Sequence, residues 1–175
     1  MPTIEVNGTT LAYEDTGGDG QAVVFSHAPS LDRTVFAAQV TRFGRAYRVV
    51  TYDHRARSTE ADVDILAEDL AALIEALDLG PSHVVGNGSV ALRLMARRPE
   101  LFRSAAVLSS SADEESVLGE LVGVTVPLLV LSGAEDVHGL PQRIADTAAN
   151  AHHVTVNGGA EAVNAQLAEH FEATT

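Results

Sequence analysis

The chain has 175 residues, 46% of them hydrophobic, and its 11 basic against 24 acidic residues give a formal net charge of -13 at pH 7. This length and apolar content predict one domain, 1–175, with a hydrophobic core. The acidity excludes nucleic acid and anionic membranes as expected partners, because both bind basic surfaces. Cysteine and lysine are both absent from the sequence, which excludes thiolate and lysine nucleophiles and disulfides.

The predicted elements begin with a β-hairpin, because the Asn7-Gly8 turn signal separates the apolar-alternating segments 4–6 and 10–14. Further runs rich in β-branched residues predict strands at 22–25, 47–52, 83–85, 104–108, 127–131 and 153–156. Apolar residues at helical spacing predict helices at 35–43, 65–77, 90–98, 140–149 and 162–171. Strands that alternate with helices predict an α/β fold with a mainly parallel sheet and helices on both faces.

The segment Gly86-Asn87-Gly88-Ser89-Val90 follows a predicted strand and precedes a predicted helix. This is the frame of a nucleophile elbow, Gly-x-Ser-x-Gly, in which a tight turn projects a serine hydroxyl. Here glycine stands at the position of the nucleophile. Gly88 has no hydroxyl to offer, and Ser89, one residue further on, is expected to turn its side chain away from a pocket at this turn.

Several further segments occur in a characteristic order and spacing. They are 25–29 (Phe-Ser-His-Ala-Pro), 52–55 (Tyr-Asp-His-Arg), 80–86 (Gly-Pro-Ser-His-Val-Val-Gly), 98–102 (Arg-Pro-Glu-Leu-Phe) and 126–136 (Val-Pro-Leu-Leu-Val-Leu-Ser-Gly-Ala-Glu-Asp). Together with the elbow frame they resemble the α/β-hydrolase superfamily over nearly the whole chain. The resemblance implies the α/β-hydrolase fold, with a ligand site at the carboxyl ends of the strands.

The resemblance also implies a catalytic triad, and this chain departs from it. Asp136 matches the triad acid, whereas Gly88 replaces the serine and Glu161, or alternatively Ala160, stands in the place of the histidine. A serine hydrolase needs both a nucleophile and a base. Ordinary Ser-His-Asp hydrolysis is therefore not expected at this elbow.

The oxyanion hole implied by the family is altered too. Ala28 replaces the glycine that follows His27, and the ungapped alignment puts Pro29, which has no N–H, where one amide donor belongs. The other donor would be the amide of Ser89. A small gap would move Ser30 into the place of Pro29, and this alternative stays open.

Only residues 109–125 link the sixth and seventh strands, which leaves no room for a cap domain, although 113–122 could form two to three helical turns. The site is then expected to be open unless a homodimer covers its mouth. The apolar residues of this link either make that contact or pack on their own core; they are Val117, Leu118, Leu121 and Val122.

The reactive groups left at this edge suggest proton transfer. If Asp136 and Glu161 lie close together, one carboxyl pKa rises and that group can act as a general acid or base. Alternatively Glu161 is an ordinary solvent-facing acid at a helix N-terminus. His27 could supply a base or a hydrogen bond, and Ser109 and Ser110, at the end of a strand, could contact a ligand.

No metal or cofactor motif is found, so we expect neither a metal nor a cofactor. The start of the chain has no signal-peptide pattern and no apolar run could span a bilayer, which predicts a cytoplasmic location.

Three functions remain open. The first is a protein that binds a small apolar organic molecule and transfers protons with Glu161, Asp136 and His27, as in an isomerase, lyase or cyclase. The second is a non-catalytic protein that binds a ligand or partner at the same edge. The third is a weak esterase with a relocated nucleophile, for example Ser89 with His27 or His138.

Overall fold

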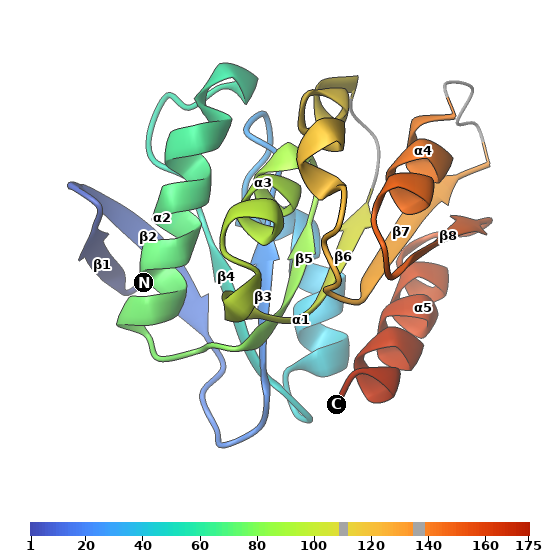
Figure 1. Cartoon of the computed structure of the whole chain (residues 1–175). Coiled ribbons are helices and arrows are strands. Elements are labelled where there is room, and N and C mark those ends of the chain that lie inside the picture. Colours follow the sequence, from blue (N-terminus) through green and yellow to red (C-terminus); the bar gives the residue numbers. More distant parts are fainter. Residues whose placement is uncertain (109–111, 135–138) are drawn as a thin grey trace.

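The computed structural model describes residues 1–108, 112–134 and 139–175. Its centre is an eight-stranded sheet with the order β1-β2-β4-β3-β5-β6-β7-β8 (Figure 1). The strands are β1 (Thr3–Val6), β2 (Thr9–Asp15), β3 (Ala22–Ser26), β4 (Arg48–Tyr52), β5 (Ser82–Gly86), β6 (Phe102–Leu108), β7 (Leu128–Gly133) and β8 (Ala151–Val156). Every strand expected from the sequence is present.

The sheet is antiparallel only at its first edge. β1 pairs with β2, and β2 pairs with β4, in antiparallel fashion, whereas β4, β3, β5, β6, β7 and β8 pair in parallel. The carboxyl ends of all the parallel strands therefore lie along one edge of the sheet, and the loops that follow the strands gather there. This arrangement confirms the mainly parallel sheet with an N-terminal hairpin.

Helices cover both faces of the sheet (Figure 1). The helical segments are η1 (Arg33–Phe36), α1 (Ala37–Phe43), η2 (Glu60–Asp62), α2 (Val63–Ala76), α3 (Ser89–Arg97), η3 (Pro99–Leu101), η4 (Ala112–Leu121), α4 (Leu140–Thr147) and α5 (Ala160–Ala173). One buried apolar cluster joins α2, α3, η4 and α4 to the sheet. A second, on the other face, joins α1 and α5 to it.

The described residues of the link between β6 and β7 form η4. Val117 and Leu121 are fully buried in the first core cluster and Leu118 packs against it, whereas Val122 is 71% exposed. Three of the four apolar residues of this link thus pack on the protein's own core. Arg93 of α3 forms ion pairs with Glu120 of η4 and Asp64 of α2, which fixes η4 beside these helices.

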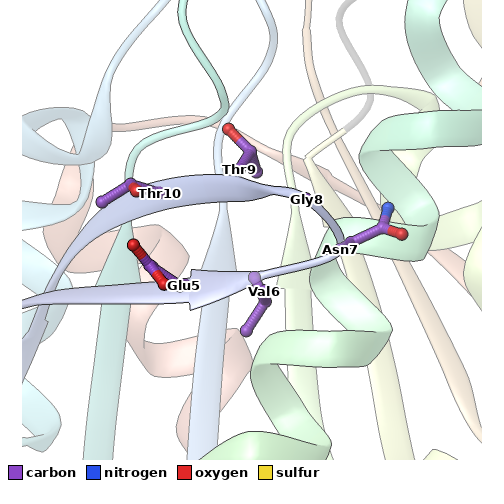
Figure 2. A pocket seen from close by; sticks show the side chains of 6 residues that line it. All are labelled: Glu5, Val6, Asn7, Gly8, Thr9 and Thr10. Atoms are coloured by element: carbon purple, nitrogen blue, oxygen red, sulfur yellow. The ribbon is translucent and has the colours of Figure 1, made fainter.

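The hairpin turn is tied to α2. Asn7 and Gly8 have φ angles of 49° and 74°, as a two-residue type I′ turn requires. Figure 2 shows the side chain of Asn7 directed from this turn toward α2, where its amide donates to the carboxylate of Asp69 at 2.8 Å. Arg55, in the loop after β4, binds the same buried carboxylate through two hydrogen bonds of 2.7 Å. One buried acid therefore holds both the hairpin and this loop.

Candidate active-site edge

The turn between β5 and α3 has the form of a nucleophile elbow. Gly88 is the N-cap of α3, with φ 111° and ψ -164°, a conformation that residues with a Cβ rarely adopt. The N–H of Asn87 donates to the carbonyl of Ser26 at the end of β3, at 2.9 Å. Ser89 begins α3 and is 2% exposed. The strand, turn and helix of the elbow are thus all in place around a glycine.

Close packing behind the turn explains the first glycine of the motif. A Cβ atom on Gly86 would lie 2.5 Å from the Cβ of Ala91 in α3, closer than two carbons can approach. A side chain at position 86 would therefore push helix and strand apart. Gly86 serves the packing of the elbow, whereas Gly88 occupies the position from which a nucleophile would project.

The loop after β3 makes a tight turn beside the elbow. The N–H of Leu31 donates to the carbonyl of Ala28 at 2.9 Å, so residues 28–31 form a β-turn with Pro29 in its second position, which suits the fixed φ of proline. Ala28 lies next to Gly88: its Cβ would be 3.7 Å from a Cβ at that position. Ala28 and Pro29 thus border the elbow, and Pro29 offers no amide donor there.

His27 connects this turn to the loop after β4. Its Nε2 accepts the backbone N–H of His54 at 3.1 Å, and its Nδ1 lies 2.6 Å from the carbonyl of Ala28. The Nε2 of His54 in turn lies 2.7 Å from the carbonyl of His27. Because Nε2 of His27 accepts, Nδ1 carries the proton and donates it to Ala28. Both ring nitrogens of His27 are therefore engaged in holding the two loops together.

Burial keeps both of these histidines neutral. It lowers the pKa of His27, and it lowers the pKa of His54 to about 4, with a further contribution from the charge that His27 would carry. The Nδ1 of His54 is buried without a hydrogen-bond partner in the described part of the chain. At neutral pH the two imidazoles thus bring no positive charge to the elbow.

Ion pairs fix the same two loops from the outside. The backbone N–H and the guanidinium of Arg33, in η1, donate to the two carboxylate oxygens of Asp53 at 2.9 and 2.6 Å. Asp53 thus binds Arg33, and Arg55 binds Asp69, which holds the loop after β4 in place. These contacts anchor the loops after β3 and β4 beside the elbow.

The structure tests only part of the predicted carboxylate pair. Glu161 lies in the first turn of α5 and is exposed, which agrees with the alternative of a solvent-facing acid at a helix N-terminus. Asp136 and His138 lie outside the described residues, as do Ser109 and Ser110. The pairing of Asp136 with Glu161 and the ligand contacts of the two serines therefore stay predictions.

Other surface features lie away from this edge. A hollow of about 360 Å³ is lined by hairpin residues 5–10 alone (Figure 2), and another, of about 440 Å³, lies between Pro2, β2, β4 and α1. Within the described ranges, no group of three or more acidic or histidine side chains could hold a metal ion. The helices of that same part of the chain are too short or too polar to cross a bilayer.

One hydroxyl–imidazole pair at this edge was missed from the sequence. The Oγ of Ser132, near the end of β7, lies 2.7 Å from Nε2 of His153 in β8. The sequence gives no motif for it, because the two residues lie 21 positions apart and His153, beside His152, has the pattern of a surface residue. Strand register alone brings them together, since β7 and β8 are neighbours.

No protein-family model matches the chain. It is 36% identical over 116 residues to a non-heme chloroperoxidase of Streptomyces lividans, covering 59% of this chain and 42% of that protein. It is 32% identical over 115 residues to 3-oxoadipate enol-lactonase 1 of Acinetobacter baylyi, covering 60% and 43%. The chain thus spans less than half the length of these two relatives.

Solved structures resemble the fold over the whole chain. The enol-lactonase of Burkholderia xenovorans LB400 superposes with a TM-score of 0.85 at 18% identity, covering 98% of this chain and 100% of that one. A thermophilic esterase from Thermogutta terrifontis has a TM-score of 0.81 at 18% identity, covering 99% of each chain. The sheet order, the elbow turn and these similarities show that the chain has the α/β-hydrolase fold.

Proposed function

We propose that this protein binds a small apolar organic molecule non-covalently at the elbow edge, without acyl transfer there. The observation that carries the proposal is Gly88: the elbow turn is intact, yet the residue that would bond to a substrate has no side chain. The space that a serine would fill beside Ala28 is available to a ligand atom.

The residues around the elbow also support non-covalent binding without acyl transfer. Pro29 cannot donate to an oxyanion, and both nitrogens of His27 are already hydrogen-bonded within the loops. α3 begins at this edge, and the N-terminus of a helix favours a ligand carbonyl or an anion. The relatives named as an enol-lactonase and an esterase favour an ester- or lactone-like ligand.

In the catalytic form of this proposal, the bound molecule undergoes proton transfer by Glu161 and Asp136, as in an isomerase, lyase or cyclase. The exposed position of Glu161 at the start of α5 leaves it free to reach the edge or to remain in solvent. The alternative is a binding protein without turnover. Once a ligand is known, Glu161→Gln tests the catalytic form of the proposal. A turnover that survives this substitution would rule out Glu161 as the acid or base.

The ligand itself is the first target of experiment. Native mass spectrometry of the purified protein, followed by identification of the small molecules it releases, tests for occupancy. Ala28→Leu fills the space beside Gly88 and should remove the bound species, whereas Ala149→Leu, on an exposed turn before β8, should leave it. Equal occupancy in both variants would place the ligand elsewhere and overturn the proposed site.

A further inference from the structure

Ser132 belongs to a row of four side chains that are linked by hydrogen bonds. Its Oγ lies 2.7 Å from Nε2 of His153, and Nδ1 of the same ring lies 3.0 Å from Oε1 of Gln142 in α4. The amide nitrogen of Gln142 donates to the carboxylate of Asp146, one helical turn further on, at 2.8 Å. The row thus runs from a hydroxyl through an imidazole and an amide to an acid.

The direction of these bonds is fixed from the acid end. Asp146 accepts only, so Gln142 turns its NH₂ group toward Asp146 and its oxygen toward His153. The ring of His153 must then carry its proton on Nδ1, and its Nε2 is left as an acceptor. The hydroxyl of Ser132 therefore donates to a basic nitrogen, which is the relation between nucleophile and base that activates a serine.

The trio of Ser132, His153 and Gln142 lies at the β8 edge of the sheet. β8 ends the sheet formed by the described residues, so no further strand among them flanks His153. Ser132 is 6% exposed, but Thr155, its register partner on β8, and the two residues after it, Gly133 and Ala134, are exposed. Gln142 is exposed as well, and His153 is half-buried. We therefore expect a small reagent to approach Ser132 from the β8 edge.

We propose that Ser132 is a second reactive centre, in which His153 acts as general base and Gln142 as its positioning residue. This centre reacts with small activated acyl and phosphonyl compounds such as aryl esters. The Oγ of Ser132 attacks the carbonyl carbon while its proton passes to Nε2 of His153. Collapse of the tetrahedral adduct breaks the bond to the aryloxy group, which leaves and takes that proton. Water then cleaves the acyl-serine and releases the acid.

The protein contains a matched trio that is closed to reagents. The Oγ of Ser104 lies 2.7 Å from Nδ1 of His83, and Nε2 of that ring lies 3.0 Å from Oε1 of Gln21. Ser104 and His83 are both fully buried, and the ring of His83 packs on Phe171 with centroids 4.8 Å apart. Burial lowers the pKa of His83 to about 4, which makes it a weak base. Both trios link a serine hydroxyl through an imidazole to a glutamine oxygen, with the two ring nitrogens exchanged, and they differ in access.

This reactivity is independent of the proposed function, because the elbow takes no part in it. The proposal includes no oxyanion hole, and the loss of a single oxyanion donor already costs about a hundredfold to a thousandfold in rate, so slow turnover is expected. The activity expected is thus covalent labelling and slow cleavage of aryl esters rather than efficient hydrolysis.

Labelling tests the inference directly on the wild-type protein. A fluorophosphonate probe followed by peptide mass spectrometry should place the adduct on Ser132. Ser132→Ala should abolish the adduct and the cleavage of p-nitrophenyl acetate, and His153→Ala should slow both about a hundredfold, the usual contribution of a general base. Ser104→Ala, in the closed trio, should label at the wild-type rate. An unlabelled wild-type protein, or an adduct confined to any other serine, would overturn the inference.

The role of Gln142 has its own readout. Gln142→Glu combined with Asp146→Asn keeps the hydrogen bonds of the row but moves the negative charge next to His153, where it stabilises the imidazolium formed during attack. This double variant should label faster than wild type, whereas Gln142→Leu should label more slowly. If Gln142 has only a structural role, the double variant should label no faster than wild type, and that result would rule out Gln142 as a positioning residue. Release of small molecules from the elbow should be unchanged in all these variants.

Discussion

A Cβ atom on Gly88 would lie 3.7 Å from the Cβ of Ala28, an ordinary van der Waals distance. The elbow therefore lacks the nucleophile but not the room for one. What opposes a side chain at this position is the backbone, whose φ of 111° is unfavourable for any residue with a Cβ. These two facts make Gly88 the most informative position for mutation.

Gly88→Ser should fold with a free energy of unfolding lowered by about 1–3 kcal/mol, the usual cost of such a backbone conformation. The introduced hydroxyl should not react with a fluorophosphonate, because Pro29 has no N–H to offer and both ring nitrogens of His27 are already hydrogen-bonded. Urea unfolding and mass spectrometry of the labelled peptide measure the two effects. Gly88→Ala is the control, since it carries the same strain without a hydroxyl. Rapid labelling at position 88 in the single variant would show that a working base is already present.

Gly86→Ala should destabilise the protein by about 1–3 kcal/mol, because the new methyl group would lie 2.5 Å from the Cβ of Ala91 and force strand and helix apart. The double variant Gly86→Ala with Ala91→Gly removes the clash and should recover part of the loss, less about 1 kcal/mol for glycine within a helix. Urea unfolding of the three proteins checks this. A double variant less stable than Gly86→Ala alone would rule out this contact as the cause.

The fold was predictable from local patterns because these agree with one another along the chain. The Asn7-Gly8 turn, the spacing of apolar residues in α2 and the β-branched run of β4 each have one favoured conformation. The pattern was weakest at 35–43 and 113–122, and there the structure begins α1 with the 3-10 segment η1 and forms η4 entirely as a 3-10 helix.

The site was less predictable, because its contacts join residues far apart in sequence. The position of Gly88 on the elbow followed from the motif. Two hydrogen-bonded pairs depend on strand register and side-chain rotamers, which no sequence motif encodes. They are His27 with His54, and Ser132 with His153.

Arg55→Ala should destabilise the protein by about 3–5 kcal/mol, because it leaves the fully buried carboxylate of Asp69 without its cation. The hairpin turn at Asn7 shares this carboxylate and should loosen with it. Arg98→Ala is the matched control: Arg98 pairs with Glu75 and Glu100 on the surface, where solvent screening leaves ion pairs little effect on stability. Chemical unfolding and hydrogen exchange of the hairpin amides provide the measurements. Similar losses in both variants would contradict the role assigned to Asp69.

The stability should fall in mild acid. Burial lowers the pKa of His54 and of His83 to about 4 in the folded protein, against about 6.5 in an unfolded chain. Above pH 6.5 both groups are neutral in either state, so their contribution is fully present. Between pH 6.5 and 4 the unfolded chain binds protons that the folded one does not, and the free energy of unfolding decreases.

Urea unfolding at intervals from pH 7.5 to 4 measures this slope. His83→Asn should make it shallower, and His152→Asn, at an exposed position, serves as the control. A slope in that range that is unaffected by His83→Asn would assign the acid sensitivity to other groups.

Labelling of the elbow peptide shows whether the elbow carries a nucleophile. Wild-type protein treated with a fluorophosphonate should show no adduct between Gly86 and Val90 after fragmentation of the peptide that contains them. An adduct on Ser89, lost in Ser89→Ala together with ester cleavage, would show that the elbow still performs acyl transfer and would contradict the account.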